Sequence, residues 1–225
     1  MLVDSVWREA YLEGIKVTPI ETQEICDGRN VATLSVADIV VINNLKHSWW
    51  MILDNLNSPL NISYVKELHQ IVGANIIPCA GKIRKQPVRI TGTTYQPKIP
   101  CENDLINLLN QINNIKNDAR QGLIAFAQFA KGQFFRDGNK RVAQLIANKL
   151  LINSSSGIFS VPVEEKYNFG KQLTQFYEDD NLDEFVNYLA VECLDEIFLP
   201  KNRQFIPTEI RDLMHRERNY NYKWK

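Results

Sequence analysis

Apolar residues recur every three or four positions along most of the chain, which is the spacing of one helix face. Near the start, this spacing is followed by Val3, Val6, Trp7, Ala10, Tyr11 and Ile15. A second helical pattern begins at Thr18, a suitable N-cap residue, with Pro19 in the first helical position and Glu21 three residues after the cap. Residues 1–34 are therefore predicted to form a helical segment that precedes the main domain.

The rest of the chain repeats the helical pattern between short polar breaks. Helices are predicted over residues 35–56, 63–72, 101–115, 119–130, 139–152, 163–177 and 181–198. The segment 119–130 is apolar nearly all round, which predicts a buried central helix. In 139–152 the predicted apolar face consists of Val142, Leu145, Ile146 and Leu150. The predicted fold class is all-α.

One segment, residues 81–97, departs from this pattern. Its sequence, GKIRKQPVRITGTTYQP, contains alternating β-branched residues and glycines, which predict an irregular β-hairpin. The expected architecture is therefore a mainly helical domain with one small β-hairpin on its surface.

Composition narrows the classes of function. The chain has 225 residues, of which 44% are hydrophobic and 23% charged, as in an ordinary globular domain. Its 26 acidic residues balance its 26 Lys and Arg, so no overall field attracts it to nucleic acid or to a membrane surface. No window approaches the roughly 20 apolar residues of a membrane-spanning helix. Four scattered cysteines predict reduced thiols in a cytoplasmic protein rather than a zinc site.

The segment GQFFRDGNKR, residues 132–141, concentrates unusual chemistry between two predicted helices. Gly138 permits a tight turn, and the free N–H groups that open the next helix form an anion site. Asn139 adds a side-chain donor, and Lys140 and Arg141 add positive charge. Asp137 beside such a site is suited to Mg²⁺, the usual partner of nucleotide phosphates. These residues taken alone indicate either nucleotide-phosphate binding or merely a charged helix cap.

Three segments in the right order resemble the Fic family. FFRDGNKR is similar to the family signature HPFx(D/E)GN(G/K)R. YLEGIKVTPIETQEI, residues 11–25, resembles the N-terminal inhibitory segment of some members, and AGKIRKQPVRITGTTYQPKIP, residues 80–100, resembles the family's flap. The resemblance divides the chain into an inhibitory-type segment (1–34), a Fic domain (35–198) and a basic, aromatic tail (199–225).

Membership of this family implies a helical domain that binds ATP as substrate with Mg²⁺ and transfers AMP to a Ser, Thr or Tyr hydroxyl of a target protein. By motif position, Asp137 holds the metal, and the phosphates are bound by Gly138, Asn139, Lys140, Arg141 and Gln144. The catalytic positions are 133, Asp137, Asn139 and Arg141. The flap binds the target by strand-like backbone pairing, with Lys82, Arg84, Val88, Ile90 and Gly92 as candidate contacts. Glu13 is the inhibitory glutamate. A homodimer is left open, whereas membrane and nucleic acid are not expected partners.

Three positions depart from the family pattern. The general-base histidine is replaced by Gln133, whose amide hydrogen-bonds but cannot accept a proton at neutral pH. Gln144 stands where many AMP-transferring members have a second arginine, a substitution shared with the phosphate-transferring Doc relatives. Glu9 stands where the inhibitory motif (S/T)xxxE(G/N) has Ser or Thr. His69, before the flap, is the one histidine considered as a replacement, and a structural role is favoured for it.

The sequence therefore supports three hypotheses. The first is an ATP- and Mg²⁺-binding Fic protein whose canonical AMP transfer is weakened or lost at Gln133. The second is an active transferase of AMP, or of phosphate as in Doc, with a substitute base. The third is a non-catalytic module that binds a peptide or partner through the flap.

Overall fold

The computed structural model describes residues 2–116 and 118–195. Its helices are α1 (Leu2–Leu12), α2 (Pro19–Cys26), α3 (Val36–Asp54), α4 (Ile62–Val72), α5 (Glu102–Asn113), α6 (Ala119–Gly132), α7 (Asn139–Asn153), α8 (Lys166–Asp179) and α9 (Leu182–Glu192). Two short strands, β1 (Ile158–Phe159) and β2 (Leu194–Asp195), pair antiparallel. The all-α fold class is confirmed, and the predicted tail, 199–225, lies outside the described residues.

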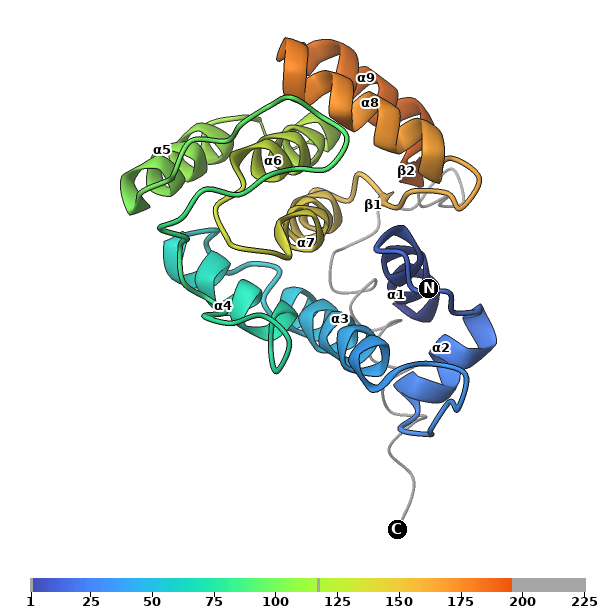
Figure 1. The fold of residues 1–225 in the computed structure, drawn as a ribbon. Helices are drawn as coiled ribbons and strands as arrows, with labels where there is room; N and C mark the ends of the chain where they lie inside the picture. The colour runs from blue at the N-terminus through green and yellow to red at the C-terminus, as the bar shows by residue number, and fades with distance from the viewer. Residues whose placement is uncertain (1, 117, 196–225) are drawn as a thin grey trace.

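Helix α7 lies at the centre of the domain (Figure 1). Helix α6 packs along it on one side, α3 and α4 on the other, and α1 lies across α3. The predicted apolar face of α7 is buried, and even the polar Asn148 and Lys149 are enclosed. Lys149 donates hydrogen bonds to the carbonyls of Asn55 and Leu56 at the end of α3. These bonds give the buried ammonium group its acceptors, and they give two carbonyls at the helix end a donor.

Local signals in the sequence fix several helix ends. Thr18 caps α2 and forms the predicted capping box with Glu21, and Ser35 caps α3. Helix α4 begins at Ile62, one residue earlier than predicted, because the side chain of Asn61 accepts a hydrogen bond from the Tyr64 N–H. The loop between α2 and α3 separates the first two helices from the rest in sequence, but α1 shares the core with α3.

The prediction of a β-hairpin over residues 81–97 is wrong. These residues, called the flap below, form an extended loop without strand pairing, and the two strands lie elsewhere in the described chain. The physical reason is that the flap is attached to the α6–α7 turn instead of to itself: the Arg84 N–H donates to the Phe134 carbonyl. Pro87 and Pro97 also remove two of the donors that a hairpin ladder would need.

No helix among residues 2–116 and 118–195 is both long enough and apolar enough to cross a membrane.

The α6–α7 contact generates a test of stability with an internal control. A Cβ added at Gly122 in α6 would lie 2.6 Å from Leu151 Cγ and 3.1 Å from the Ala147 carbonyl, both in α7. Gly122→Ala is expected to destabilise the protein, because overpacking costs about 1–3 kcal/mol and outweighs the better helix propensity of alanine.

Gly170 in α8 is the matched control, since an added Cβ there has no neighbour within 4 Å. Gly170→Ala is expected to stabilise the protein by about 0.5–1 kcal/mol. Thermal denaturation of both variants checks the account, and equal effects of the two substitutions would show that α6 and α7 are not packed as described.

Candidate functional site

The turn between α6 and α7 is shaped by the amide of Asn139. Its Oδ1 accepts a hydrogen bond from the Phe135 N–H at 2.8 Å, and its Nδ2 donates to the Phe135 carbonyl at 2.9 Å. Nδ2 also donates to Gln133 Oε1 at 3.1 Å. Asn139 is buried, and both N–H groups of its side-chain amide are used inside the turn. Asn139 therefore holds the loop, and its predicted role as a donor to a phosphate stays a prediction.

Helix α7 starts with an open N-terminus. Gly138 is its N-cap residue in a left-handed conformation, with φ 75°, and no side chain caps the helix. Asp137 turns back on this end, where its Oδ1 accepts a hydrogen bond from the Gly138 N–H at 2.6 Å. N–H groups of the first turn of α7, together with the positive end of the helix dipole, therefore point at one place on the surface and can bind an anion.

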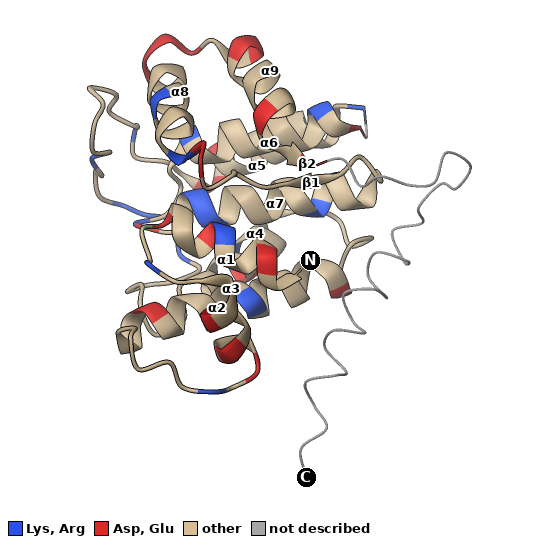
Figure 2. Ribbon diagram, turned by 90° about the vertical axis from the view of Figure 1, so that its right-hand side faces the viewer, with Lys and Arg blue, Asp and Glu red and all other residues tan. Residues whose placement is uncertain are grey.

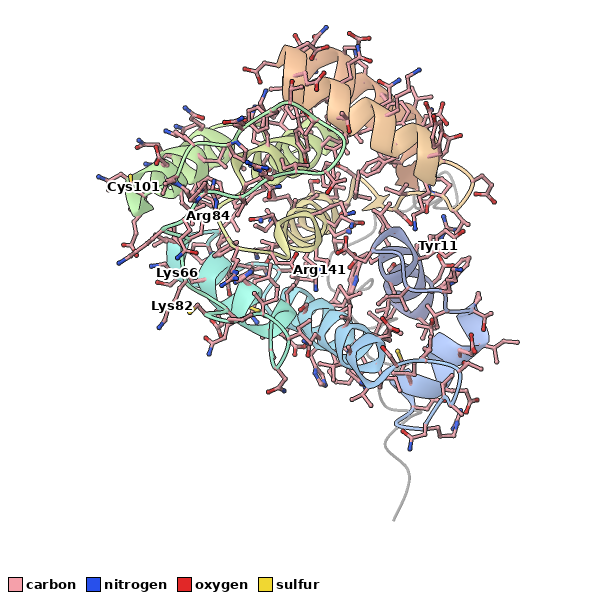
Figure 3. All side chains as sticks on the ribbon, in the orientation of Figure 1. Tyr11, Lys66, Lys82, Arg84, Cys101 and Arg141 are labelled. Atoms are coloured by element: carbon pink, nitrogen blue, oxygen red, sulfur yellow. The ribbon has the colours of Figure 1, made fainter. Side chains whose placement is uncertain are left out.

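Glu13 lies just after α1 and contacts the cations at the start of α7. Its Oε1 is 3.0 Å from Lys140 Nζ, and its Oε2 is 3.1 Å from Arg141 Nε. Arg141 also lies 3.4 Å from Asp137 through Nη2 and Oδ2. Arg141 is seen between α7 and α1 in Figure 3. The predicted inhibitory residue is thus brought to the predicted phosphate-binding cations, although they are 127 and 128 positions away in the sequence.

Gln144 is almost completely enclosed, at 1% exposure, one turn further along α7. It is brought close to the site but not onto its surface. The positive charge of the site therefore depends on Lys140 and Arg141. Glu13 contacts both of these residues, and no second arginine is present at position 144.

Gln133 occupies the C-cap position of α6 in a left-handed conformation, with φ 44° and ψ 54°. Its Nε2 donates to the Ala130 carbonyl at 2.7 Å, and its Oε1 accepts from Asn139. Tyr177 donates to the same Ala130 carbonyl at 3.3 Å, and burial raises the pKa of its phenol far above neutral pH. Neither side chain can serve as a proton acceptor at neutral pH, and the amide of Gln133 is held by the turn.

His69 has a structural role, as the sequence favoured. Its Nδ1 accepts a hydrogen bond from the Gly81 N–H at 2.7 Å, so its Nε2 carries the proton that faces the Asp137 carbonyl at 3.0 Å. The ring stacks on Phe135 with centroids 3.7 Å apart. Burial lowers the pKa of His69, so the imidazole is neutral and both nitrogens are used. The residue ties the start of the flap to the turn.

The flap residues are distributed over two pockets and the core. Arg84 is buried and donates through its guanidinium to the carbonyls of Gln133, Gln86 and Lys98. Lys82, Arg84 and Val88 line one pocket, and Gly92 lines another. Ile90 instead packs against the hydrophobic core. Thr93 and Thr94 bind the carboxylate of Glu178 on α8, so the far end of the flap is attached as well.

The pocket that includes Gly92 is open and measures about 780 Å³; we call it the aromatic pocket. It is lined by Tyr11, Gly92, Val163, Glu164, Lys166, Tyr167, Gly170, Lys171 and Thr174. Tyr167 is 85% exposed, so its ring is available for stacking. Burial lowers the pKa of Lys166, an effect to which Lys140 adds and which Glu13 opposes. Lys166 Nζ donates to the carbonyl of Tyr11, two residues before Glu13.

The second pocket lies on the other half of the flap and measures about 520 Å³; we call it the basic pocket. It is lined by His69, Pro78, Cys79, Lys82, Ile83, Arg84, Lys85, Gln86, Pro87, Val88, Arg89 and Arg136. Arg136 directly precedes Asp137, so this pocket also adjoins the turn. Each pocket thus has a lining residue close in sequence to this site, Tyr11 near Glu13 in one and Arg136 beside Asp137 in the other.

Glu9 is a buried carboxyl whose environment the sequence did not reveal. It lies in α1 at 3% exposure, and burial raises its pKa well above the usual range. The Trp49 indole and Arg141 favour the ionised form, whereas Glu13 disfavours it, and the effect of burial dominates. The helical spacing placed Glu9 among the apolar residues Val6 and Ala10, which is the one sequence signal of its burial.

Comparison with known proteins gives a family match for the central part of the chain. Residues 59–151 match the model of the Fic/DOC family. The structure is similar to a Fic domain-containing signaling protein from Bacteroides thetaiotaomicron, with a TM-score of 0.72 and 20% identity, covering 84% of this chain and 81% of that one. A search of curated proteins found no match.

Two further solved structures are longer than this chain. A fragment of Fic-1 from C. elegans has a TM-score of 0.72 and 21% identity, covering 97% of this chain and 64% of that one. A Fic family protein from Desulfovibrio desulfuricans has a TM-score of 0.66 and 13% identity, covering 100% of this chain and 66% of that one. The chain therefore spans about two thirds of each of these two structures, and the likeness is one of fold.

The burial of Glu9 predicts a dependence of stability on pH. Below the ordinary pKa of glutamate both the folded and the unfolded states are protonated, so Glu9 has no effect on stability. Above that pH the unfolded state ionises while the folded state resists ionisation, so the contribution of Glu9 becomes increasingly unfavourable until the raised pKa is reached.

Glu9→Gln is therefore expected to raise Tm at pH 7–8, by about 2–4 °C for each kcal/mol of ionisation cost removed. The difference between variant and wild type should shrink towards pH 4. Thermal denaturation across pH tests this, and a variant that is less stable at pH 8 than wild type would show that the carboxylate is favourably paired.

Proposed function

We propose that this chain, whose residues 59–151 belong to the Fic/DOC family and whose fold is that of Fic proteins, binds ATP with Mg²⁺ at the α6–α7 turn. We further propose that it is related to AMP-transferring enzymes and that its canonical transfer is weakened or lost. The observation that carries this proposal is the contrast within one turn. The start of α7 has no side-chain cap and can accept an anion, whereas the base position holds Gln133, with its amide bound to Ala130 and Asn139.

Three features support nucleotide binding. The first turn of α7 offers N–H groups and Lys140 and Arg141 to the phosphates. The aromatic pocket is lined by Tyr11, two residues before the Glu13 that contacts these cations, and it offers the exposed Tyr167 to a base. Its volume of about 780 Å³ lies within the range of small-molecule sites.

The exposed carboxylate of Asp137 suits the way in which proteins bind Mg²⁺ together with a nucleotide. Its side chain is 68% exposed beside the anion site, and among the described residues no cluster of three His, Cys, Asp or Glu exists that would bind a metal without help. Mg²⁺ commonly takes one or two carboxylates and completes its shell with water and substrate phosphates, so a single carboxylate at this place is sufficient. The ion would supply neutralisation of phosphate charge.

The chemistry that remains incomplete is proton removal. In AMP transfer a target hydroxyl oxygen attacks the α-phosphorus, the bond to the β-phosphate oxygen breaks, pyrophosphate leaves, and the hydroxyl proton must pass to a base. Lys140, Arg141 and the α7 N–H groups are placed to stabilise the phosphate charge. Gln133 cannot take the proton, and loss of a general base costs about 10²–10⁴-fold in rate.

Glu13 opposes productive binding in this proposal. Its carboxylate contacts the two cations that the phosphates require, so phosphate must compete with Glu13 for Lys140 and Arg141. Of these two cations, Arg141 is the arginine of the motif. The position where many relatives have a second arginine holds the enclosed Gln144, so Glu13 has no second arginine to contact there.

One alternative within the family has a specific observation in its favour. The absence of a second arginine at Gln144 is shared with phosphate-transferring Doc relatives, so the donor chemistry could be transfer of the γ-phosphate. Neither His69 nor Tyr177 offers a replacement base for either reaction, because both are buried and hydrogen-bonded. An active enzyme would therefore use another substitute base, or one supplied by the target or by water.

ATP binding tests the first part of the proposal. In isothermal titration with Mg·ATP, wild type is expected to bind, and Asp137→Ala is expected to lose about tenfold or more in Mg²⁺-dependent affinity, because the metal loses its protein ligand. Glu67→Ala is the control, since Glu67 is an exposed carboxylate of α4 that lines neither pocket. The nucleotide-binding proposal fails if wild type does not bind Mg·ATP, or if Asp137→Ala and Glu67→Ala bind equally well.

Restoring the base tests the second part. Gln133→His is expected to increase transfer of label from α-labelled ATP to protein by about 10²–10⁴-fold, the usual contribution of a general base. Gln133→Asn, which keeps an amide, should show no gain. Parallel reactions with γ-labelled ATP distinguish AMP transfer from phosphate transfer. If wild type labels a target as fast as Gln133→His does, the proposal that activity is lost with the general base is contradicted, and a substitute base is favoured.

A further inference from the structure

The basic pocket contains an unusual excess of positive charge. Five of its lining residues are cations and none is acidic; the cations are Lys82, Arg84, Lys85, Arg89 and Arg136. Figure 2 marks Lys and Arg in blue along the loop between α4 and α5, which contains the flap. The whole chain has a net charge of zero, so this excess is a local feature and not a consequence of composition.

Four of these cations have no acidic partner among the described residues. Lys82, Lys85, Arg89 and Arg136 are exposed, and none of their side chains forms an ion pair or hydrogen bond with residues 2–116 or 118–195. Other flexible cations nearby are neutralised, as Lys66 is by Glu102 and Lys98 is by Asp104. The fifth cation, Arg84, donates only to backbone carbonyls, so no carboxylate offsets its charge either. The pocket is therefore complementary to an anionic ligand.

The backbone around this pocket is also available for pairing. Residues 82–91 form no strand within the described chain, with bends at Lys82 and Gln86, and Arg84 makes the one backbone bond from them to the turn, to Phe134. An extended peptide placed along this segment can pair with free backbone groups while its side chains enter the pocket. The pocket volume of about 520 Å³ accommodates a few side chains.

The lining favours a peptide over a nucleic acid. Proteins that bind single strands stack successive bases on exposed aromatic rings. The one ring that lines the basic pocket is that of His69, which is 1% exposed and already stacked on Phe135. The remaining apolar lining is aliphatic or proline, including Ile83, Pro87 and Val88, and suits the stems of peptide side chains.

We propose that the basic pocket binds a target segment rich in Asp and Glu, and that acidic residues therefore flank the hydroxyl residue that this protein addresses. The inference rests on the proposed function for the role of the hydroxyl, but the binding of an acidic segment does not depend on it. Arg136 connects the basic pocket with the proposed phosphate site, because it lines the pocket and directly precedes Asp137. An acidic segment held by Lys85, Arg89 and Arg136 places its neighbouring residues beside the α6–α7 turn.

The test uses a fluorescein-labelled peptide with one serine between runs of Glu and Asp, and a length-matched peptide with Gln in place of every acid. Fluorescence anisotropy with the full chain is expected to show binding of the acidic peptide and about tenfold or more weaker binding of the Gln peptide. The double variant Lys85→Glu, Arg89→Glu should weaken binding of the acidic peptide by about tenfold or more, because attraction becomes repulsion.

The control variant carries the same change of charge at another place. Lys16 and Lys116 are exposed, and neither lines either pocket, so Lys16→Glu, Lys116→Glu should bind the acidic peptide as wild type does at equal ionic strength. Equal weakening in both double variants would overturn the proposal, since binding would then follow overall charge. Thermal denaturation establishes that both variants are folded.

Two competition experiments complete the design. Excess Mg·ATP should leave the peptide bound, and displacement of the peptide would identify the pocket as part of the nucleotide site and overturn the proposal. A single-stranded oligonucleotide that binds more tightly than the acidic peptide at the same salt concentration would also overturn it. If the peptide binds as expected while wild type fails to bind Mg·ATP, the acidic specificity stands and the proposed nucleotide function fails.

Discussion

The buried amide of Asn139 fixes the turn on which the rest of the site depends. By bonding to both backbone groups of Phe135 and to Gln133, it closes the chain between α6 and α7 without using the N–H groups at the start of α7. Loss of such a buried, satisfied amide would leave backbone groups unpaired at a cost of about 1–3 kcal/mol each. The open end of α7 is therefore a product of this side chain.

Segments that are distant in the sequence are attached to that turn. Arg84 brings the flap to the carbonyls of Gln133 and Phe134, and His69 brings the end of α4 to the carbonyl of Asp137. Glu13 reaches the same place from the N-terminal helix through Lys140 and Arg141. The turn, the flap, α4 and the N-terminal helix thus meet at the start of α7, and each of the two pockets has a lining residue close in sequence to this place.

Sequence reasoning predicted the helices well because their signals are local. The capping box at Thr18, the cap at Ser35 and the apolar face of α7 each depend on residues within a few positions of one another. The all-helical fold was confirmed for the same reason, and the motif is a continuous segment within the residues 59–151 that match the Fic/DOC family model. The flap was misread as a hairpin because alternation does not reveal that its partner is the α6–α7 turn, about 50 residues away.

Long-range contacts were the part that the sequence could not provide. Asn139 looked like a phosphate donor, and only its contacts with Phe135 and Gln133 show that its donors are used within the turn. The partners of Glu13 depended on how α1 packs against the centre of the domain, and the addition of Arg136 to the cations of the flap depended on how the flap lies against the α6–α7 turn. None of these contacts has a signature in residue spacing.

The central claim is that a competent phosphate site remains, contacted by Glu13 and deprived of a base at Gln133. The most direct measurement is the rate of label transfer from saturating α-labelled Mg·ATP by the double variant Glu13→Gln, Gln133→His, compared with each single variant. The account predicts that the double variant exceeds both, because one change frees Lys140 and Arg141 while the other supplies the proton acceptor. A double variant that binds Mg·ATP but transfers no label would contradict it.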